Sequence, residues 1–373
     1  MIKYTYSPEG EVMTKGATTA IAGDSYVEAL FAKANGILGK DAVLKNKALD
    51  MYKAMDTVVA EDGGNLVQTI LFQGILEKLR FQGVVAPLFT DLTMPSPTYQ
   101  LPVELEQATI FLTPENTEST GQTSYSSSNP TVGRMSLVAK KFTGMSFLSG
   151  ELEDDAVIDI IRHIVDSHSK GLALGMDKAI LDGDTASTHQ DADVTGTRDV
   201  RTAFEGLRKL ARGASLTVDA GGDAISLADI AGAEAALGKY AVNTEDLVWI
   251  LSPKTYIQLK ALALNTTNNN MVAFGYSNGR LSTINAVRIV ITEAVRNGLT
   301  ANAVNTGSGN LTYAALVNTS QFYTGTRAAL RFESERKPEF DQTVLYSRLR
   351  KGFAPMYETS ASETNVAIIR NLL

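Results

Sequence analysis

The longest regular pattern along the chain is an apolar stripe that predicts one helix over 151–181. The stripe positions recur every three or four residues, as one face of a helix requires: Val157, Ile161, Ile164, His168, Leu172, Met176 and Ala179. The first turn carries acidic residues that complement the helix dipole: Glu151, Glu153, Asp154 and Asp155. Such a helix would span about 46 Å. This is long for a domain of this size, so we expect a spine on which other parts lie.

Between residues 87 and 130 the pattern changes to six prolines and short β-type segments. Prolines at this density exclude a long helix and suit edge strands and turns. Residues 99–105 and 108–113 predict strands, the polar stretch 115–129 predicts a loop tip, and 134–149 predicts the returning strand. We therefore expect a long β-hairpin. Its apolar content is too low for a core of its own, so another surface must support it.

The segment 196–324 mixes helical and strand patterns and predicts an α/β domain. The expected strands are 247–251, 287–291 and 311–317. The expected helices are 202–212, one that begins at Ser226 with a capping box to Asp229, and one that begins at Ser252 and Pro253. The expected tight turns are Asn278-Gly279 and Asn297-Gly298.

A second β-ribbon is predicted over 327–350, with Pro338 in its connection. Ala328, Leu330 and Phe332 alternate with charged residues, so one face of the ribbon carries both signs. The candidate contact residues on this face are Arg327, Arg331, Glu333, Glu335, Arg348 and Arg350. The face is either a solvated strand surface or a contact with another subunit. Residues 366–373 are apolar enough to dock as a final strand.

The N-terminal region predicts a weakly patterned stretch over 1–23 and helices over 24–35, 41–60 and 69–81. The apolar stripe of the second helix is narrow: Leu44, Ala48, Met51, Met55 and Val58. This helix either packs on its own domain or lies as an arm on a neighbouring subunit. Residues 1–10 lack the features of a signal peptide, and no apolar run is long enough to span a membrane. We therefore expect synthesis in the cytosol and no membrane partner.

Composition excludes several kinds of chemistry. The chain has no cysteine, so it has no disulfide, thiolate metal site or cysteine nucleophile. Its net charge is −7 and it has no basic tail, which argues against tight DNA binding. His163 and His168 lack the spacing of a zinc helix. Asp182-Gly-Asp184 begins like a calcium loop, but Ser187 stands where glycine is required, so the stretch is either a weak cation site or a helix stop.

Phosphate-binding and nucleophile-elbow motifs are also missing from the sequence. We therefore predict no catalytic residue, no cofactor and no metal, and a protein that is not an enzyme. Two ribbons with little core of their own and an oversized helix predict self-assembly instead.

The order of these parts resembles the major capsid protein of tailed bacteriophages, with its Hong Kong-97-type fold. The motifs that carry the resemblance run over nearly the whole chain: Gly63-Gly64-Asn65-Leu66-Val67, Leu148-Ser-Gly-Glu-Leu-Glu-Asp-Asp155, Gly175-Met-Asp-Lys-Ala-Ile-Leu-Asp-Gly-Asp184, Leu251-Ser-Pro-Lys-Thr-Tyr256, Phe274-Gly275, Arg331-Phe-Glu and Tyr346-Ser-Arg-Leu-Arg-Lys-Gly-Phe353. Each is weak singly, and their order and spacing give the resemblance its specificity.

The resemblance implies an α+β fold with an N-arm, an extended β-hairpin loop, a long spine helix, and peripheral and axial domains. The implied division is an N-arm over 1–60, the first part of the peripheral domain over 61–91, the extended loop over 92–148, the spine-helix part over 149–195, the axial domain over 196–324, the peripheral ribbon over 325–352, and a C-terminal segment over 353–373 that returns to the axial domain. The loop would overlap a neighbour, which makes Glu118 and Tyr125 further candidate contacts.

The resemblance also implies a function. Such proteins assemble as pentamers and hexamers into an icosahedral shell around double-stranded DNA, in the host cytoplasm and then in the virion. Portal, scaffolding and decoration proteins are the implied partners. Two departures matter. The loop has no lysine between Asp91 and Ala139, so covalent cross-linking is not expected. About 60 residues precede Gly63, so a scaffold is either a separate protein or already removed.

Two alternatives stay open at the level of sequence. An encapsulin-like compartment shares the fold and encloses protein cargo in place of DNA. An oligomeric enzyme with a β-ribbon arm would form a small oligomer and no shell.

Overall fold

The computed structural model describes residues 5–6, 12–13, 83–113, 125–155, 160–264, 274–360 and 362–373, without the side chains of 153–155. The chain divides into two compact units, Met1–Ile75 and Leu76–Leu373. In the first unit the described elements are β1 (Thr5–Tyr6) and β2 (Val12–Met13), which pair antiparallel. The helices expected over 24–35, 41–60 and 69–81 lie outside the described residues. The second unit contains a seven-stranded sheet and a four-stranded sheet.

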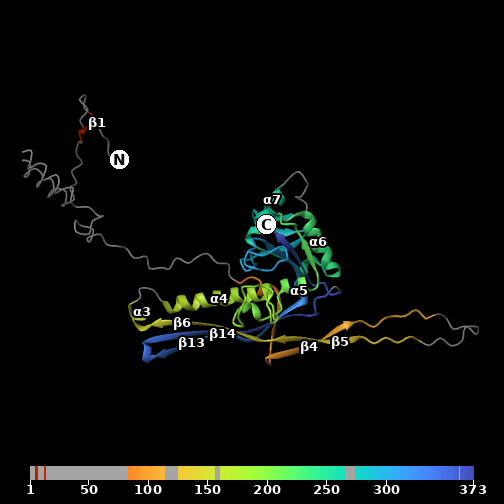
Figure 1. The fold of residues 1–373 in the computed structure, drawn as a ribbon, viewed down its shortest axis with the longest axis horizontal. Helices are drawn as coiled ribbons and strands as arrows, with labels where there is room; N and C mark the ends of the chain where they lie inside the picture. Colours follow the sequence, from red (N-terminus) through yellow and green to blue (C-terminus); the bar gives the residue numbers. More distant parts are fainter. Residues whose placement is uncertain are drawn as a thin grey trace, which may run out of the picture. The chain divides into compact units, whose positions relative to one another are not determined.

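A seven-stranded mixed sheet forms one half of this unit (Figure 1). Its strands, in spatial order, are β7 (Thr217–Asp219), β15 (Val366–Leu372), β12 (Thr312–Asn318), β8 (Leu247–Leu251), β11 (Val287–Ile291), β10 (Arg280–Ile284) and β9 (Phe274–Ser277). All residues of β8 and β12 are buried, as their apolar runs predicted. The last strand of the chain, β15, lies between β7 and β12, which confirms the expected docking of the C-terminal segment.

Helices cover both faces of this sheet. One face packs on α5 (Leu207–Gly213), and the other packs on α6 (Leu227–Leu237) and α7 (Pro253–Leu264). The capping box of Ser226 and Asp229 is present, and the Ser252 hydroxyl accepts a hydrogen bond from the Thr255 amide at 3.1 Å. Both predicted helix starts are therefore confirmed.

Two further local predictions have different outcomes. Asn278 and Gly279 both have positive φ, 50° and 72°, in the tight turn between β9 and β10, which confirms that turn. The helix expected over 202–212 is wrong at its start, because α5 begins at Leu207, after a short 3-10 turn, η4 (Val200–Thr202). Gly206 instead donates its amide to the Gly183 carbonyl at 3.0 Å. A Cβ on Gly206 would overlap the Gly183 amide, so this close approach fixes the start of α5.

A four-stranded sheet forms the other half, in the order β3 (Thr90–Thr93), β13 (Phe322–Lys337), β14 (Gln342–Pro355) and β6 (Lys140–Ser149). The predicted ribbon 327–350 is confirmed as the β13–β14 pair, with Pro338 in its connection. Helix α4 (Ile160–Asp182) lies along β6 and β14 (Figure 1). The His168 imidazole and the Ser146 hydroxyl of β6 form a hydrogen bond of 2.7 Å, which joins helix and sheet.

The extended loop differs from its prediction. Strand β4 (Thr98–Glu106) pairs with β5 (Thr131–Val138), and the pairing ends at Glu106 and Thr131. The returning strand expected over 134–149 is two strands, β5 and β6, with Ala139 between them. These two strands belong to different sheets, because β6 pairs with β14 in the four-stranded sheet.

A small apolar cluster supports the base of the β4–β5 ribbon. Met94, Val103, Met135 and Leu137 are buried together, and Tyr323 and Ala354 of the four-stranded sheet pack against them. The ribbon base is therefore supported by another part of its own subunit, which agrees with the expectation that a surface outside the hairpin must support it. The strand expected over 108–113 is wrong, because these residues lie outside every described strand.

Helix α4 joins the two halves. The single helix expected over 151–181 is described as α3 (Gly150–Asp155) and α4, and residues 156–159 lie outside the described part. The last turns of α4, from Met176 to Asp182, are almost wholly buried, in one core shared by strands of both sheets. Five phenylalanines from separate segments pack in this core: Phe89, Phe142, Phe204, Phe322 and Phe353.

Asp177 fixes the buried end of α4 to the segment that leads into β3. Its carboxylate accepts hydrogen bonds from the amides of Val84, Val85 and Ala86 at 2.7, 3.0 and 2.9 Å. Burial raises the pKa of this carboxyl above its usual value, and the three amide donors oppose the rise. A fully buried carboxylate without these donors would carry a large desolvation cost.

We expect Asp177→Ala to lower the free energy of unfolding by about 3 kcal/mol, because it leaves three amides without their acceptor. Urea unfolding can be followed by the fluorescence of Trp249, the single tryptophan, which is fully buried in β8. Asp166→Ala on the same helix is the matched control, since Asp166 forms an exposed pair with Lys170 and should cost at most about 0.5 kcal/mol. Equal unfolding midpoints for the two variants would contradict this role.

Candidate intersubunit surfaces

The β13–β14 ribbon presents the charged face that the sequence predicted. Register places Arg331 opposite Arg348 and Glu333 opposite Tyr346. The exposed positions of this face are Arg327, Arg331, Glu333, Glu335, Arg348 and Arg350, while Ala328, Leu330 and Phe332 are half-buried. The six predicted residues therefore share one surface.

The acidic residues of this face have partners within the subunit. Arg348 forms an ion pair with Glu333, and the Tyr346 hydroxyl donates to Glu335 at 3.3 Å. Most of the cations have no such partner. Arg327 donates only to the Met94 carbonyl, at 3.3 Å, and Arg331 and Arg350 form no ion pair with any described residue.

A hollow of about 370 Å³ gathers these cations. It is lined by Lys141, Arg327, Arg331, Arg348 and Arg350, and Lys141 lies directly opposite Arg350 in the β6–β14 pair. The surface carries both signs in sequence, but its unpaired charges are positive. A second copy of the same surface would be repelled, so the complementary partner is an anionic surface.

The segments that continue beyond the β4–β5 pair expose apolar side chains. Tyr125 is 89% exposed, Ile110 is 90% exposed and Leu112 is 98% exposed. The other candidate of this loop, Glu118, lies outside the described residues. Apolar side chains gathered in one exposed ribbon are typical of a surface that a partner covers.

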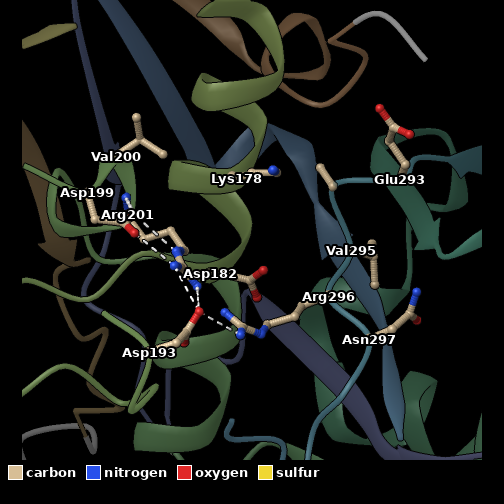
Figure 2. A pocket seen from close by; sticks show the side chains of 11 residues that line it. Lys178, Asp182, Asp193, Asp199, Val200, Arg201, Glu293, Val295, Arg296 and Asn297 are labelled. Atoms are coloured by element: carbon tan, nitrogen blue, oxygen red, sulfur yellow. Dashed lines mark hydrogen bonds and ion pairs between the residues drawn. The ribbon is translucent and has the colours of Figure 1, made fainter. Parts of the chain in front are cut away.

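An ion cluster that the sequence did not predict lies at the end of α4. Figure 2 shows it beside a hollow of about 430 Å³, with Lys178 and Asp182 of α4 on one side and Arg296 on the other. The Asp193 carboxylate bridges Arg201 at 3.1 Å and Arg296 at 2.8 Å. Arg296 lies about a hundred residues from Asp193 in sequence, and no local pattern signals such a contact.

Behind this cluster lies Arg208, whose side chain is fully buried. Its guanidinium donates to Asp182 at 2.6 Å, to Asp191 at 3.0 Å and to the Ala303 carbonyl at 2.6 Å. The Tyr313 hydroxyl also donates to Asp182, at 2.8 Å. Burial alone would raise the pKa of the Asp191 carboxyl, but the hydrogen bonds and charge of Arg208 hold it below its usual value.

These contacts bear on whether Asp182-Gly-Asp184 is a weak cation site or a helix stop. Asp182 binds Arg208, and Asp184 accepts from the amides of Ala186 and Gln190 at 2.9 and 2.8 Å and pairs with Lys209 at 3.1 Å. Helix α4 ends at Asp182, as the helix-stop reading predicted, and both carboxylates have partners within the subunit. The described residues contain no cluster of acidic and histidine side chains fit for a metal ion. They also contain no helix with the length and hydropathy needed to cross a membrane.

We expect Arg208→Met to lower the free energy of unfolding by about 4 kcal/mol, because it leaves the buried Asp182 without its cation and leaves Asp191 with only the more distant Arg296, at 3.5 Å. Arg212→Met on the same helix is the matched control, since the half-buried Arg212 donates to Gln190 and should cost about 1 kcal/mol. The measurement is again urea unfolding by Trp249 fluorescence. If Arg208→Met lowers the free energy of unfolding no more than the control does, the buried ion pairs are not needed for stability.

Comparison with known proteins gives a family and a fold. The phage capsid family matches residues 63–361. A structure from Microbacterium phage Oxtober96 is 17% identical, with a TM-score of 0.62 over 84% of this chain and 99% of that chain. The capsid of a native GTA particle is 15% identical, with a TM-score of 0.60 over 85% of this chain and 99% of that chain.

A third structure, from Mycobacterium phage Bobi, is 16% identical, with a TM-score of 0.60 over 85% of this chain and 98% of that chain. No curated protein matches. The family match favours a phage capsid over an encapsulin-like compartment and a structural role over an enzymatic one. The chain belongs to the phage capsid family and is a major capsid protein with the Hong Kong-97-type fold, a structural protein that assembles with copies of itself into the shell of a phage.

Proposed function

We propose that this capsid protein assembles as pentamers and hexamers into an icosahedral shell around the double-stranded DNA of a tailed phage. The observation that carries the proposal is the set of apolar side chains in segment 105–112, of which Ile110 and Leu112 are almost fully exposed in the described part of the subunit. The GTA capsid was computed with C5 symmetry, which supports a five-fold arrangement by analogy. The net charge of −7 favours enclosing DNA over gripping its phosphates.

The proposed parts follow the division of the sequence. The N-arm is 1–60, the peripheral domain comprises 61–91, 149–195 and 325–352, the extended loop is 92–148, and the axial domain is 196–324 with 353–373. In this division α4 belongs to the peripheral domain, and its buried end packs in the core that this domain shares with the axial domain. A force on either domain would therefore reach the other through the helix.

Non-covalent contacts hold the proposed shell. The loop has no lysine from 92 to 139, and the first lysines after it, Lys140 and Lys141, begin β6. Many weak contacts on each subunit add up in a closed shell, because each contact keeps the others at high effective concentration. Portal, scaffolding and decoration proteins are the proposed partners, and the host cytoplasm is the proposed place of assembly.

Electron microscopy of the purified protein tests the shell directly, and deletion of residues 118–128 tests the loop. We expect closed particles from the unaltered chain, with nuclease-protected DNA in particles from infected cells. The deleted chain should keep its circular dichroism spectrum and unfolding midpoint but give at least tenfold fewer particles. Small oligomers from the unaltered chain would refute the shell, and full particle yield from the deleted chain would refute the overlap role.

We expect charge reversal at Arg331 to lower particle yield at low salt, because the cationic hollow then meets its anionic partner with the wrong sign. The loss should shrink as salt increases, since salt screens exposed charges. Arg331→Lys is the matched control and should assemble like the unaltered chain. Yields that are equal for Arg331→Glu and Arg331→Lys at every salt concentration would show that this face is only solvated.

A further inference from the structure

We infer that segment 108–113 of one subunit pairs, as an added β-strand, with the open edge of β6 in a neighbouring subunit. The inference rests on the proposed shell and names the surface that receives the extended loop. Strand addition supplies main-chain hydrogen bonds to both edges, and side-chain contacts set its register.

The donor is a segment with β-type residues and no strand partner. Residues 108–113 continue from β4, and the Thr109 amide donates a hydrogen bond of 3.1 Å to the Ser128 hydroxyl across the ribbon. Ile110 and Leu112 are almost fully exposed, while Phe111 between them is less so. Burial of two such side chains against an apolar surface is favourable.

The acceptor is the last strand of the four-stranded sheet. Strand β6 pairs with β14 on one side, and no described strand pairs with its other side. Met145 and Phe147 stand two residues apart on one face of β6, and they are 55% and 57% exposed. A ten-residue open edge with exposed apolar side chains is a template for another strand.

A groove marks this open edge near the start of β6. Its volume is about 680 Å³, and its lining includes four consecutive residues, 140–143, together with residues of the 197–203 segment. Consecutive strand residues point to opposite faces, so a groove that touches all four runs along the strand edge. Lys140, Lys141 and Arg198 line it, and none of them forms an ion pair with a described residue.

The donor carries the complementary charge. Residues 92–139 include four glutamates and one arginine, and Glu104 and Glu106 are exposed at the end of β4. When the acidic donor strand enters the cationic groove, its glutamates are attracted to the lysines and the arginine that line the groove. The apolar residues of the strand then lie beside the apolar part of β6.

One parallel register brings together both the opposite charges and the apolar side chains of the two strands. Glu106 and Ile110 are four residues apart, as are Lys141 and Met145. Placing Glu106 beside Lys141 therefore puts Ile110 beside Met145 and Leu112 beside Phe147. The ribbon runs away from the sheet that contains β6 (Figure 1), so the added strand comes from a second copy.

Engineered disulfides test this register, because the chain has no cysteine of its own. Adjacent strands place opposite Cα atoms about 5 Å apart, which a disulfide can bridge. Shells of Ile110→Cys/Met145→Cys are assembled under reducing conditions and then oxidised. We expect a ladder of linked subunits on a non-reducing gel, and the same ladder from Leu112→Cys/Phe147→Cys. Phe111→Cys/Met145→Cys, with one thiol on the opposite face, is the control and should give at least tenfold less.

Each outcome decides the inference. Shells in which the Ile110→Cys/Met145→Cys pair links no better than the control overturn the added strand and leave the shell intact. A Met145→Cys thiol that is shielded from maleimide in shells, yet unlinked to position 110, shows that another segment or protein covers the edge, and also overturns it. Absence of shells from the unaltered chain overturns the proposed function itself.

A charge exchange gives a second test that needs no cysteine. Lys141→Glu should lower particle yield about tenfold, and adding Glu106→Lys in the same chain should restore most of it. Lys141→Glu alone and Glu106→Lys alone should each keep the unfolding midpoint of the unaltered chain, because neither residue forms an ion pair with a described residue of its own subunit. A double variant that assembles no better than Lys141→Glu overturns the proposed pairing of these two residues.

Discussion

The buried end of α4 is the constraint on which the rest of the subunit depends. Its last turns pack in a core shared by both sheets, and buried carboxylates hold it on two sides. Asp177 binds the chain that leads into β3, and Asp182 binds Arg208 beneath the seven-stranded sheet. Because the two halves share one core, they cannot shift against each other without exposing aromatic side chains to water.

Charge is divided between two parts of the subunit, the acidic extended loop and the cationic start of β6. The acids of the β13–β14 face are used within the subunit, which leaves its cations unpaired. This division favours contact between unlike surfaces over contact between like ones. Unlike contacts lead from one copy to the next, and such head-to-tail interfaces close into rings when the rotation between copies allows it.

Elements that depend on local signals were predicted correctly. Ser226, Ser252 and the Asn278-Gly279 turn act within a few residues, so the sequence displays them directly. Residues 108–113 have the pattern of a strand, but a strand also needs a partner to pair with. The prediction was wrong because no partner strand exists in the described part of the subunit. The Arg208 network was missed because its members come from three distant segments, and each aspartate in sequence is typical of any loop.

The candidate contact residues were only partly predictable, because their partners lie in distant segments of the sequence. Alternation along 327–335 correctly placed Arg331 and Glu333 on one face. It could not show that Glu333 is neutralised by Arg348, since this depends on the register between two strands. Lys141 was predicted only as a residue at the base of the loop, because its place beside Arg350 depends on the pairing of β6 with β14.

The position of β15 has a consequence for the order in which the chain folds during synthesis. Residues 366–372 fill the gap between β7 and β12, so the seven-stranded sheet is two separate pieces until they arrive. Synthesis runs from the N-terminus, and earlier segments can fold as they emerge. The ribbon and β6 emerge long before this sheet can close. A nascent chain therefore exposes the open edge of β6 before the seven-stranded sheet is complete, and the rate of translation sets the length of that interval.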